Sequence, residues 1–444
     1  MYPIWEVPYI SAGLVLGLIA AFHILPSHLS TGAMWFNIYV ETKAYRENKP
    51  ELKEFIKKYT LLLLVFSYVL GSLSGIGIWY AATVTNPRGI SGLIHNYVWG
   101  WATEWVFFLI EVIGIFIYYY TFDKVDKKTH LTIGWIFALA SWTTMVIIVG
   151  ILSFMLTPGK WPKTGGFFAG FFNPTYWPQL FVRTAFMFVI AAAYALACAT
   201  RVKDNTVRTS ITQVASLWGI GGLLLGSLLL FWFLNTLPEK SKELLAILPS
   251  VELKGGLFVS LALLILYFLF ARLKPLKINV YTAVFAIIVI FGGIWSLERM
   301  REMIRKPYVI PQYMFSNQII AHTVEAKGVQ SEEKVISEKG ILKVFPFIPE
   351  GTREINQRNQ WEAGRLIALL QCGSCHVLDQ NGLRAMPQMI GRMNIKKGKG
   401  FNDQEIAQVE NLIDSLGSYP YMLPFLGTAA EKRALALYLY SLAK

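Results

Sequence analysis

Two cysteines and a histidine stand together near the C-terminal end of the chain, where residues 372–376 read Cys-Gly-Ser-Cys-His. In a C-x-x-C-H motif the two thiols form thioether bonds to haem vinyl groups, and the histidine is placed to bind the iron. A zinc site would need two further Cys or His ligands, and a redox C-x-x-C would not require the histidine. The motif therefore predicts one covalent haem c, attached at Cys372 and Cys375 with His376 as an iron ligand.

The second axial ligand of this haem is expected nearer the C-terminus. Residues 421–425 (Tyr-Met-Leu-Pro-Phe) precede an expected final helix at 428–442, and a helix carrying Gly364 leads into the motif. This arrangement resembles the class I cytochromes c, and the resemblance implies Met422 as the sixth ligand. A His/Met pair raises the reduction potential, which suits a relay that takes electrons from a soluble donor. The competing methionines, for which core packing is the alternative role, are Met386, Met389 and Met393.

The rest of the chain, which must position these side chains, has the composition of a membrane protein. The chain has 444 residues, 54% hydrophobic and 16% charged, and its apolar residues lie in long uninterrupted runs. A bilayer core about 30 Å thick needs about 20 apolar helical residues. Eight transmembrane helices are expected, centred on residues 12–38, 59–83, 98–121, 131–156, 178–199, 211–234, 256–271 and 280–297. The fold class is therefore all-α, a polytopic helix bundle with a small helical C-terminal domain.

The lysines and arginines indicate the orientation of this bundle. The connections 41–58, 123–130, 201–210 and 272–279 hold 15 of them, whereas those on the other side hold 6. By the positive-inside rule the first set is cytoplasmic, so both termini lie on the periplasmic side of a bacterial cytoplasmic membrane. The first apolar run lacks a basic n-region, so no cleavable signal peptide is expected. The net charge of +13 belongs to these topology signals, and no nucleic-acid partner is expected.

These patterns predict that the chain has three parts. Residues 1–306 form the transmembrane domain, residues 307–345 an outer-surface segment or linker, and residues 346–444 a compact domain that holds the haem c motif. In the last part we expect a helix at 361–371, an irregular Gly- and Met-rich middle, and the final helix.

Ionisable residues within the membrane segments are functional candidates, because a polar group inside the bilayer costs several kcal/mol unless it is partnered. The candidates are His23, Glu104, Glu111, Arg183, Glu298 and Glu302. Glu104 and Glu111 are nearly two helical turns apart, so they point the same way about 10 Å apart along the axis. Each candidate has a structural alternative: a helix–helix hydrogen bond for His23, and buried structural pairs for the two glutamates. His28, His95, His130 and His322, at helix ends or in loops, are assigned no ligand role.

The membrane part of the sequence resembles subunit I of the cytochrome bd oxidases, and the likeness covers roughly residues 10–200 and 295–317. Residues 22–25 (Phe-His-Ile-Leu) are similar to the first-helix stretch whose histidine binds a high-spin haem in that family. The resemblance implies that role for His23.

The resemblance extends to the three acidic candidates. Glu104 and Glu111 look like the family's paired acids associated with haem and proton delivery; Glu111 aligns cleanly and Glu104 is off by one residue. Glu302, five residues before Pro307, resembles the glutamate ligand beside the family's Gly-Arg-Gln-Pro-Trp signature. Glu298, one turn earlier, is its rival for this role.

Two departures from the family pattern concern its electron donor. Arg183 stands where the family has the histidine that binds the low-spin haem, and it pairs either with a haem propionate or with a carboxylate at a helix end. The long quinol-binding loop after the sixth helix is missing too, because about 20 residues separate segments six and seven. The family's ninth helix and cytoplasmic C-terminus are also absent from this pattern. We infer that haem c replaces quinol and the low-spin haem as the electron entry.

The expected function is that of a bd-like terminal oxidase subunit. Electrons would pass from an outer cytochrome c or another outer redox donor through haem c to one or two b- or d-type haems, where dioxygen is reduced. The alternative is a membrane-bound electron-transfer subunit that links an outer redox enzyme or soluble cytochrome to another carrier without reducing oxygen. A transporter or channel is disfavoured, because neither would need a haem-attachment motif. A second membrane subunit or a homodimer is expected to complete the bundle.

Overall fold

The computed structural model describes residues 5–378, 381–392 and 402–443. Within these ranges eight helical segments are apolar and long enough to cross a membrane, which confirms the all-α bundle expected from the sequence. They are α1 (Ala12–Glu47), the continuous run of α2 (Pro50–Leu62), η1 (Leu63–Leu70) and α3 (Gly71–Thr85), α4 (Pro87–Tyr120), α5 (Lys127–Phe154), α8 (Tyr176–Ala199), α9 (Asn205–Asn235), α11 (Val251–Leu273) and α12 (Val280–Met303). The connections contain the short helices α6 (Trp161–Thr164), α7 (Phe167–Phe171), α10 (Glu239–Ile247) and η2 (Pro275–Lys277).

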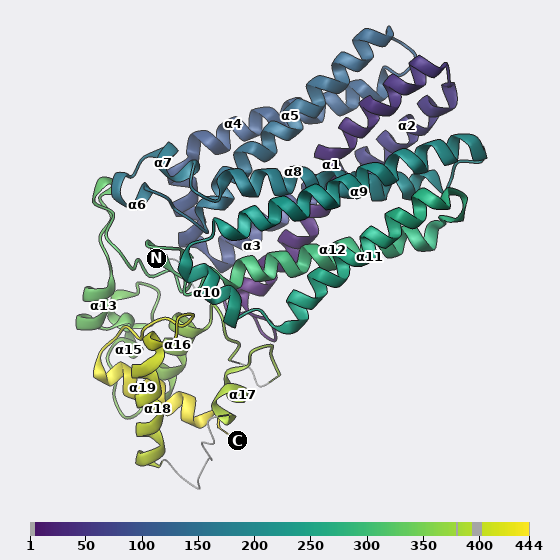
Figure 1. Cartoon of the computed structure of the whole chain (residues 1–444). Helices are drawn as coiled ribbons and strands as arrows, with labels where there is room; N and C mark the ends of the chain where they lie inside the picture. The colour runs from purple at the N-terminus through teal and green to yellow at the C-terminus, as the bar shows by residue number, and fades with distance from the viewer. Residues whose placement is uncertain (1–4, 379–380, 393–401, 444) are drawn as a thin grey trace.

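Helix α1 is central to the bundle and packs against α2, α3, α5, α8 and α12 (Figure 1). Small residues allow its close approach to α8, since a Cβ at Gly32 would lie 2.4 Å from the carbonyl oxygen of Met187. The stretch of α8 from Val189 to Ala193 is correspondingly buried throughout. Close backbone contact through small residues is the usual basis of helix association in a bilayer, where apolar burial between helices gains little.

The second membrane segment contains a π-helix, which the sequence pattern does not reveal. Residues Leu63–Leu70 adopt it between α2 and α3, within a run that begins at Pro50 rather than near residue 59. A π-helical turn rotates the residues that follow, and such turns occur often at functional sites. Here it carries Tyr68, whose hydroxyl lies 2.8 Å from Ser30 Oγ of α1.

The chain after α12 folds against the end of the bundle. It forms β1 (Tyr308–Ile310), β2 (Met314–Phe315), η3 (Glu325–Lys327), α13 (Glu333–Lys339) and α14 (Ile341–Val344). Arg88, in the first turn of α4, donates to both carboxylate oxygens of Glu332 at 2.7 and 2.9 Å and to the carbonyl of Gln318. This segment is therefore fixed to the bundle at α4.

The C-terminal part consists of α15 (Glu350–Arg353), α16 (Gln360–Cys372), α17 (Met386–Gly391), α18 (Asp403–Ser415), η4 (Leu416–Ser418) and α19 (Ala429–Ser441). The irregular middle expected from the sequence is wrong for α18, whose first turn is capped by Asn402 and whose buried face holds Ile406, Val409 and Ile413. Its apolar residues recur at helical spacing, and the surrounding Gly- and Met-rich sequence obscured them. Met393 lies outside the described residues.

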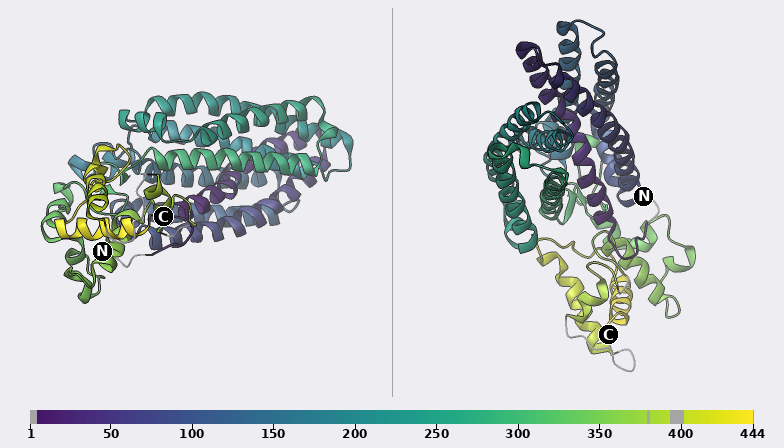
Figure 2. Two further views of the ribbon diagram at one scale, coloured as in Figure 1. Left: turned by 90° about the horizontal axis from the view of Figure 1, so that it is seen from below. Right: turned by 90° about the vertical axis from the view of Figure 1, so that its right-hand side faces the viewer.

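The C-terminal domain sits at the end of the bundle where the N-terminus also lies (Figures 1 and 2). The carbonyl of Tyr9 accepts from the backbone N–H of Leu383 at 2.8 Å, and Glu6 pairs with Arg365 at 3.3 Å. The two ends of the chain are therefore on one side of the bundle, as an even number of spans requires.

Candidate functional site

The Cys-Gly-Ser-Cys-His motif begins at the last residue of α16. The backbone N–H groups of Cys375 and His376 both donate to the carbonyl of Cys372, at 3.1 and 2.9 Å, so the motif forms a tight turn. Both cysteines are free thiols. The imidazole Nδ1 of His376 lies 3.4 Å from the carbonyl oxygen of Arg384. A carbonyl can only accept, so Nδ1 carries the proton and Nε2 keeps the lone pair that an iron ligand needs.

Burial sets the protonation of this motif. It raises the pKa of the Cys372 thiol to about 12, with the nearby Cys375 adding to the effect. It also lowers the pKa of His376, so the imidazole stays neutral. Neutral imidazole is the form that binds a metal. The three side chains therefore fit covalent haem attachment and axial ligation.

The loop that carries Met422 is fastened directly to the residue that precedes the motif. Gln371 Nε2 donates to the carbonyl of Leu426, and Gln371 Oε1 accepts from its N–H at 3.2 Å. Met422 is half-buried in this loop, whereas Met386 is buried in the core of the domain. The arrangement favours Met422 over Met386 as a residue available to a ligand.

Helices α16 and α19 cross in direct backbone contact within this domain. A Cβ at Gly364 would lie 2.1 Å from the carbonyl oxygen of Ala434 and 2.7 Å from Tyr438 Cβ. Thr428 and Glu431 form a capping box at the start of α19, and the Glu431 carboxylate also accepts from the N–H groups of Ile341 and Leu342. Glu431 thus ties α14 to α19 and holds the C-terminal domain together.

His23, in α1, has one ring nitrogen engaged. Its Nδ1 lies 2.9 Å from Ser74 Oγ of α3, and this hydroxyl also lies 2.9 Å from the carbonyl of Gly71. The single hydroxyl proton of Ser74 is donated to that carbonyl, so Ser74 accepts a hydrogen bond from His23 Nδ1–H. In the neutral ring, His23 Nε2 is then unprotonated and keeps the lone pair that a metal ligand needs. An oriented imidazole with a second hydrogen-bonding partner is the usual form of a metal-binding histidine.

Glu111 lies in a buried polar group formed by α1, α4 and η1. Its Oε2 accepts from Ser30 Oγ at 3.2 Å, and Ser30 contacts Tyr68. Only 4% of Glu111 is exposed, whereas Glu104, two turns earlier on α4, is half-buried and makes no hydrogen bond within the described ranges. The structure therefore separates the two acids into a partnered interior carboxylate and a more accessible one.

The C-terminal end of α12 holds two carboxylates whose ion pairs differ. Glu298 accepts from Arg183 of α8 at 3.3 Å through Oε1 and from Arg301 at 2.8 Å through Oε2. Glu302 pairs with Arg299 through Oε2 alone, and its Oε1 faces Gly13 of α1. Both oxygens of Glu298 are thus occupied by arginines, and Glu302 is the carboxylate with an oxygen left for another ligand.

The sequence left two partners open for Arg183, a haem propionate or a carboxylate at a helix end. In the structure Arg183 pairs with Glu298, a carboxylate near the end of α12. Its Nη1 also lies 3.3 Å from His28 Nε2. The expectation that His28 lies at a helix end or in a loop is wrong, since it is buried in the middle of α1. Pro26 interrupts the apolar pattern there without ending the helix. Sequence reasoning missed this contact, for which no motif gives a signal.

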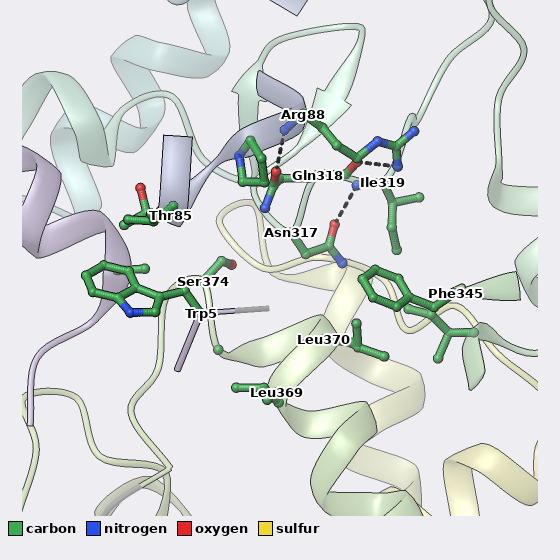
Figure 3. A pocket seen from close by; sticks show the side chains of 15 residues that line it. Trp5, Thr85, Arg88, Asn317, Gln318, Ile319, Phe345, Leu369, Leu370 and Ser374 are labelled. Atoms are coloured by element: carbon green, nitrogen blue, oxygen red, sulfur yellow. Dashed lines mark hydrogen bonds between the residues drawn. The ribbon is translucent and has the colours of Figure 1, made fainter. Parts of the chain in front are cut away.

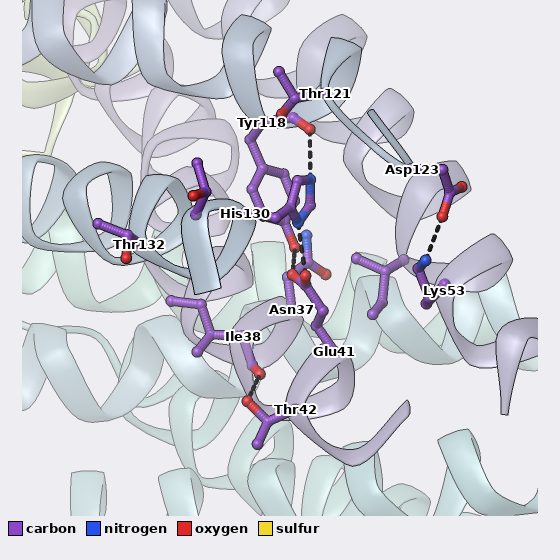
Figure 4. A network of polar contacts seen from close by, with 12 residues as sticks. Asn37, Ile38, Glu41, Thr42, Lys53, Tyr118, Thr121, Asp123, His130 and Thr132 are labelled. Atoms are coloured by element: carbon purple, nitrogen blue, oxygen red, sulfur yellow. Dashed lines mark hydrogen bonds and ion pairs between the residues drawn. The ribbon is translucent and has the colours of Figure 1, made fainter. Parts of the chain in front are cut away.

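A second buried network lies at the opposite end of the bundle and was also missed (Figure 4). Glu41 of α1 is fully buried and accepts from Tyr118 of α4, while His130 Nδ1 of α5 lies 2.6 Å from its other oxygen. His130 Nε2 donates to the carbonyl of Tyr118, 3.0 Å away, so Nδ1 donates only if the ring is charged. These contacts join α1, α4 and α5 at the end that the charge count assigns to the cytoplasm.

The Cys-Gly-Ser-Cys-His motif lies against the bundle. Lys306 Nζ, three residues after α12, is 3.3 Å from Cys375 Sγ, and Tyr421 packs on an apolar cluster that includes Leu237 and Ile304. A cavity of about 70 Å³ lies beside Ser374 where the two parts meet. Figure 3 shows that residues of both parts line it. Burial together with the charge of Arg301 lowers the pKa of Arg305, which lies next to this contact, to about 10.

The fold defines a multi-pass membrane protein with buried histidine, carboxylate and arginine side chains between its helices. The sequence model of cytochrome bd terminal oxidase subunit I matches residues 12–233, half of the chain. The chain belongs to this family. Its members bind b- and d-type haems, and membership supports an oxidoreductase role. The matched residues end before α11, so Glu298, Glu302 and the Cys-Gly-Ser-Cys-His motif lie outside them.

Among solved structures, the chain is similar to the bd oxidase from Geobacillus thermodenitrificans. The TM-score is 0.58 at 15% sequence identity, and the alignment covers 74% of this chain and 92% of that chain. At this identity the likeness concerns the fold. Comparison with curated proteins gave no match.

Proposed function

We propose that this chain is the haem-bearing subunit of a bd-type terminal oxidase that receives electrons through a covalent haem c and reduces dioxygen at a high-spin haem in the bundle. The observation that carries the proposal is the placement of the Cys-Gly-Ser-Cys-His motif against the end of α12, where Lys306 contacts Cys375. An electron-entry group in that position would lie near Glu302, which precedes Lys306 by four residues. Bound haem supplies one-electron transfer and, at an open iron site, dioxygen binding.

Residues 346–444 are proposed as a cytochrome c domain. Cys372 and Cys375 would hold the haem covalently, His376 would bind the iron through Nε2, and Met422 would complete the coordination. The neutral state of His376 and the attachment of the Met422 loop to Gln371 support this assignment. Residues 307–345 act as a structured connection rather than a free linker, because Arg88 holds Glu332.

His23 and Glu302 are proposed as ligands of separate haems. Glu302 faces Gly13 and Gly17 of α1, which precede His23 by ten and six residues. At 1.5 Å per residue the two side chains are about 9–15 Å apart along the helix axis. Two axial ligands of one iron lie much closer together, so these side chains serve two sites.

Glu111 and Glu104 are proposed to carry protons to bound dioxygen. Glu111 is buried among hydroxyl groups that can pass a proton, and Glu104 lies about 10 Å along α4 on a less buried surface. The charge count places the C-terminal domain on the periplasmic side, where a cytochrome c or another outer donor can reach it. A second membrane subunit or a second copy would cover the apolar surface of the bundle.

Spectroscopy of the detergent-purified protein tests the proposal. Haem c, seen by haem staining of the denatured chain and abolished in Cys372→Ser, should accompany non-covalent haem in the pyridine haemochrome assay. Reduced protein should bind carbon monoxide, and His23→Ala should remove one membrane-haem signal while haem c remains. Haem c accompanied only by haem that does not react with carbon monoxide would contradict oxygen reduction and favour the electron-transfer subunit. A chain without covalent haem would overturn the proposed electron entry.

A further inference from the structure

Three arginines gather at the outer end of the bundle with too little negative charge to balance them. The arginine cluster consists of Arg183, Arg301 and Arg305, and Glu298 is the carboxylate that pairs with the first two. Glu302 is already paired with Arg299. The cluster thus carries three positive charges against one negative charge. The side chains of Arg183 and Arg301 are only 14% and 18% exposed, so this excess lies largely out of water.

Two guanidinium nitrogens of the cluster have no partner among the described residues. Arg301 Nη1 and Arg305 Nε are both shielded from solvent and make no hydrogen bond. Arg305 Nη1 donates to the sulfur of Met155 at 3.8 Å. Leaving a buried donor unpaired costs about 1–3 kcal/mol, and more when the group is charged. Two such nitrogens in one cluster therefore call for an acceptor that the described residues do not supply.

We propose that the arginine cluster binds the two propionate carboxylates of a haem in the bundle. Two carboxylates would supply the two missing negative charges and acceptors for both unpartnered nitrogens. Arginine is suited to this task because its planar guanidinium donates in a fork that matches a carboxylate. The inference rests on the proposed function, and it adds a binding role for Arg301 and Arg305.

The position of the cluster fits a haem held by α12. Arg301 and Arg305 flank Glu302 in the sequence, and Arg183 reaches the same end of α12 from α8. The phosphate of a lipid headgroup offers similar chemistry at a membrane surface. Two observations favour the propionates: the cluster joins α8 to the end of α12, and a pair of carboxylates balances its charge.

The test compares Arg301→Gln with Arg208→Gln, a control at the far end of the bundle whose arginine donates to the carbonyl of Ile278. Non-covalent haem per chain is measured by pyridine haemochrome, with covalent haem c as the internal standard for folded protein. Redox titration then gives the midpoint potentials. In Arg301→Gln we expect about tenfold weaker retention of one membrane haem. The retained haem should have a lower potential, because a positive charge that stabilises the reduced state is lost.

A second variant keeps the test decisive if Arg301→Gln does not fold. Glu298→Gln removes the internal carboxylate and raises the excess positive charge, so the same haem should be retained with a higher potential. Unchanged haem retention and potential in both variants would overturn the inference while leaving the proposed function intact. Loss of a bound phospholipid, measured as phosphorus per chain, with unaltered haem would assign the cluster to a lipid instead. Wild-type protein without non-covalent haem would overturn the proposed function as well.

Discussion

Gly13 of α1 faces the carboxylate of Glu302 of α12. A Cβ at Gly13 would lie 2.7 Å from Glu302 Oε1, and one at Gly17, a turn further on, 3.5 Å from Oε2. The missing side chains leave the space that the carboxylate occupies. The position of Glu302 therefore depends on α1 as well as on its own helix.

Gly13→Ala should move this carboxylate without unfolding the protein, because the clashing atom is the end of a flexible side chain. If Glu302 binds a haem, the membrane-haem content per haem c should fall at least severalfold, as measured by pyridine haemochrome. Gly255→Ala in α11 is the control, since a Cβ there meets nothing within 4 Å. Full haem content in Gly13→Ala would remove Glu302 from the ligand set.

Ser74→Ala should weaken the site at His23. The hydroxyl fixes the ring with Nδ1 protonated, and loss of such a partner typically costs 10- to 100-fold in metal affinity. Haem retention during dilution in detergent measures the effect, with Ser72→Ala on the same helix as the control. Equal retention in the two variants would show that Ser74 does not orient a ligand.

Gly364→Ala should destabilise the C-terminal domain by about 2 kcal/mol, since overpacking costs about 1–3 kcal/mol. The new methyl group would meet the backbone oxygen of Ala434, which can move only with α19. Limited proteolysis with haem staining of the fragments reports this change. Gly351→Ala, where a Cβ meets nothing within 4 Å, should behave like the wild type.

His130→Ala should destabilise the membrane bundle by about 2 kcal/mol, because it removes one hydrogen-bond partner of a buried carboxylate. The fully buried Glu41 would keep Tyr118 but lose its 2.6 Å contact to the imidazole. Lys58→Ala breaks an exposed pair with Glu54 and should cost less than about 1 kcal/mol. Recovery of monodisperse protein after heating compares the variants. Additive losses in a Glu41→Gln, His130→Ala double variant would contradict direct coupling of the pair.

Protein produced without haem attachment should lose stability at high pH through Cys372. Its pKa is raised to about 12 in the folded state, so the folded chain holds the thiol proton while the unfolded chain, near 9, releases it. Stability from this group is complete below pH 9 and falls as the pH rises towards 12, by about 1.4 kcal/mol at pH 10. Denaturation of the haem-free chain at pH 8 and 10 measures the loss, and Cys372→Ala should reduce it. The haem-bound protein should lack this component, because a thioether does not titrate.

The membrane helices were predictable because each needs a long apolar run, a signal that survives in a single sequence. Where prediction failed, the cause was local. Helix α18 is amphipathic but lies in a segment rich in Gly and Met, and Pro26 lies inside α1 without ending it. The π-helix of Leu63–Leu70 has the same composition as the α-helix on either side, so only its backbone reveals it.

The candidate site shows a similar division. The Cys-Gly-Ser-Cys-His motif is contiguous and could be found by spacing alone, whereas the contact of Arg183 with His28 joins residues 155 positions apart. The same holds for Ser74, which bonds His23 across 51 residues. Such pairs arise from helix packing, and one sequence does not encode them in any local pattern.

The ion pair between Arg88 and Glu332 bears on the timing of the proposed electron entry. A domain on a free tether meets its target by diffusion, and the encounter rate then depends on tether length and solvent viscosity. Here Arg88 anchors the polypeptide after α12 to α4. Glu6, near the N-terminus, pairs with Arg365 of the C-terminal domain. These ion pairs therefore hold the C-terminal domain in a fixed position against the bundle. Passage of an electron from it into the bundle would depend on a set distance and would be insensitive to viscosity.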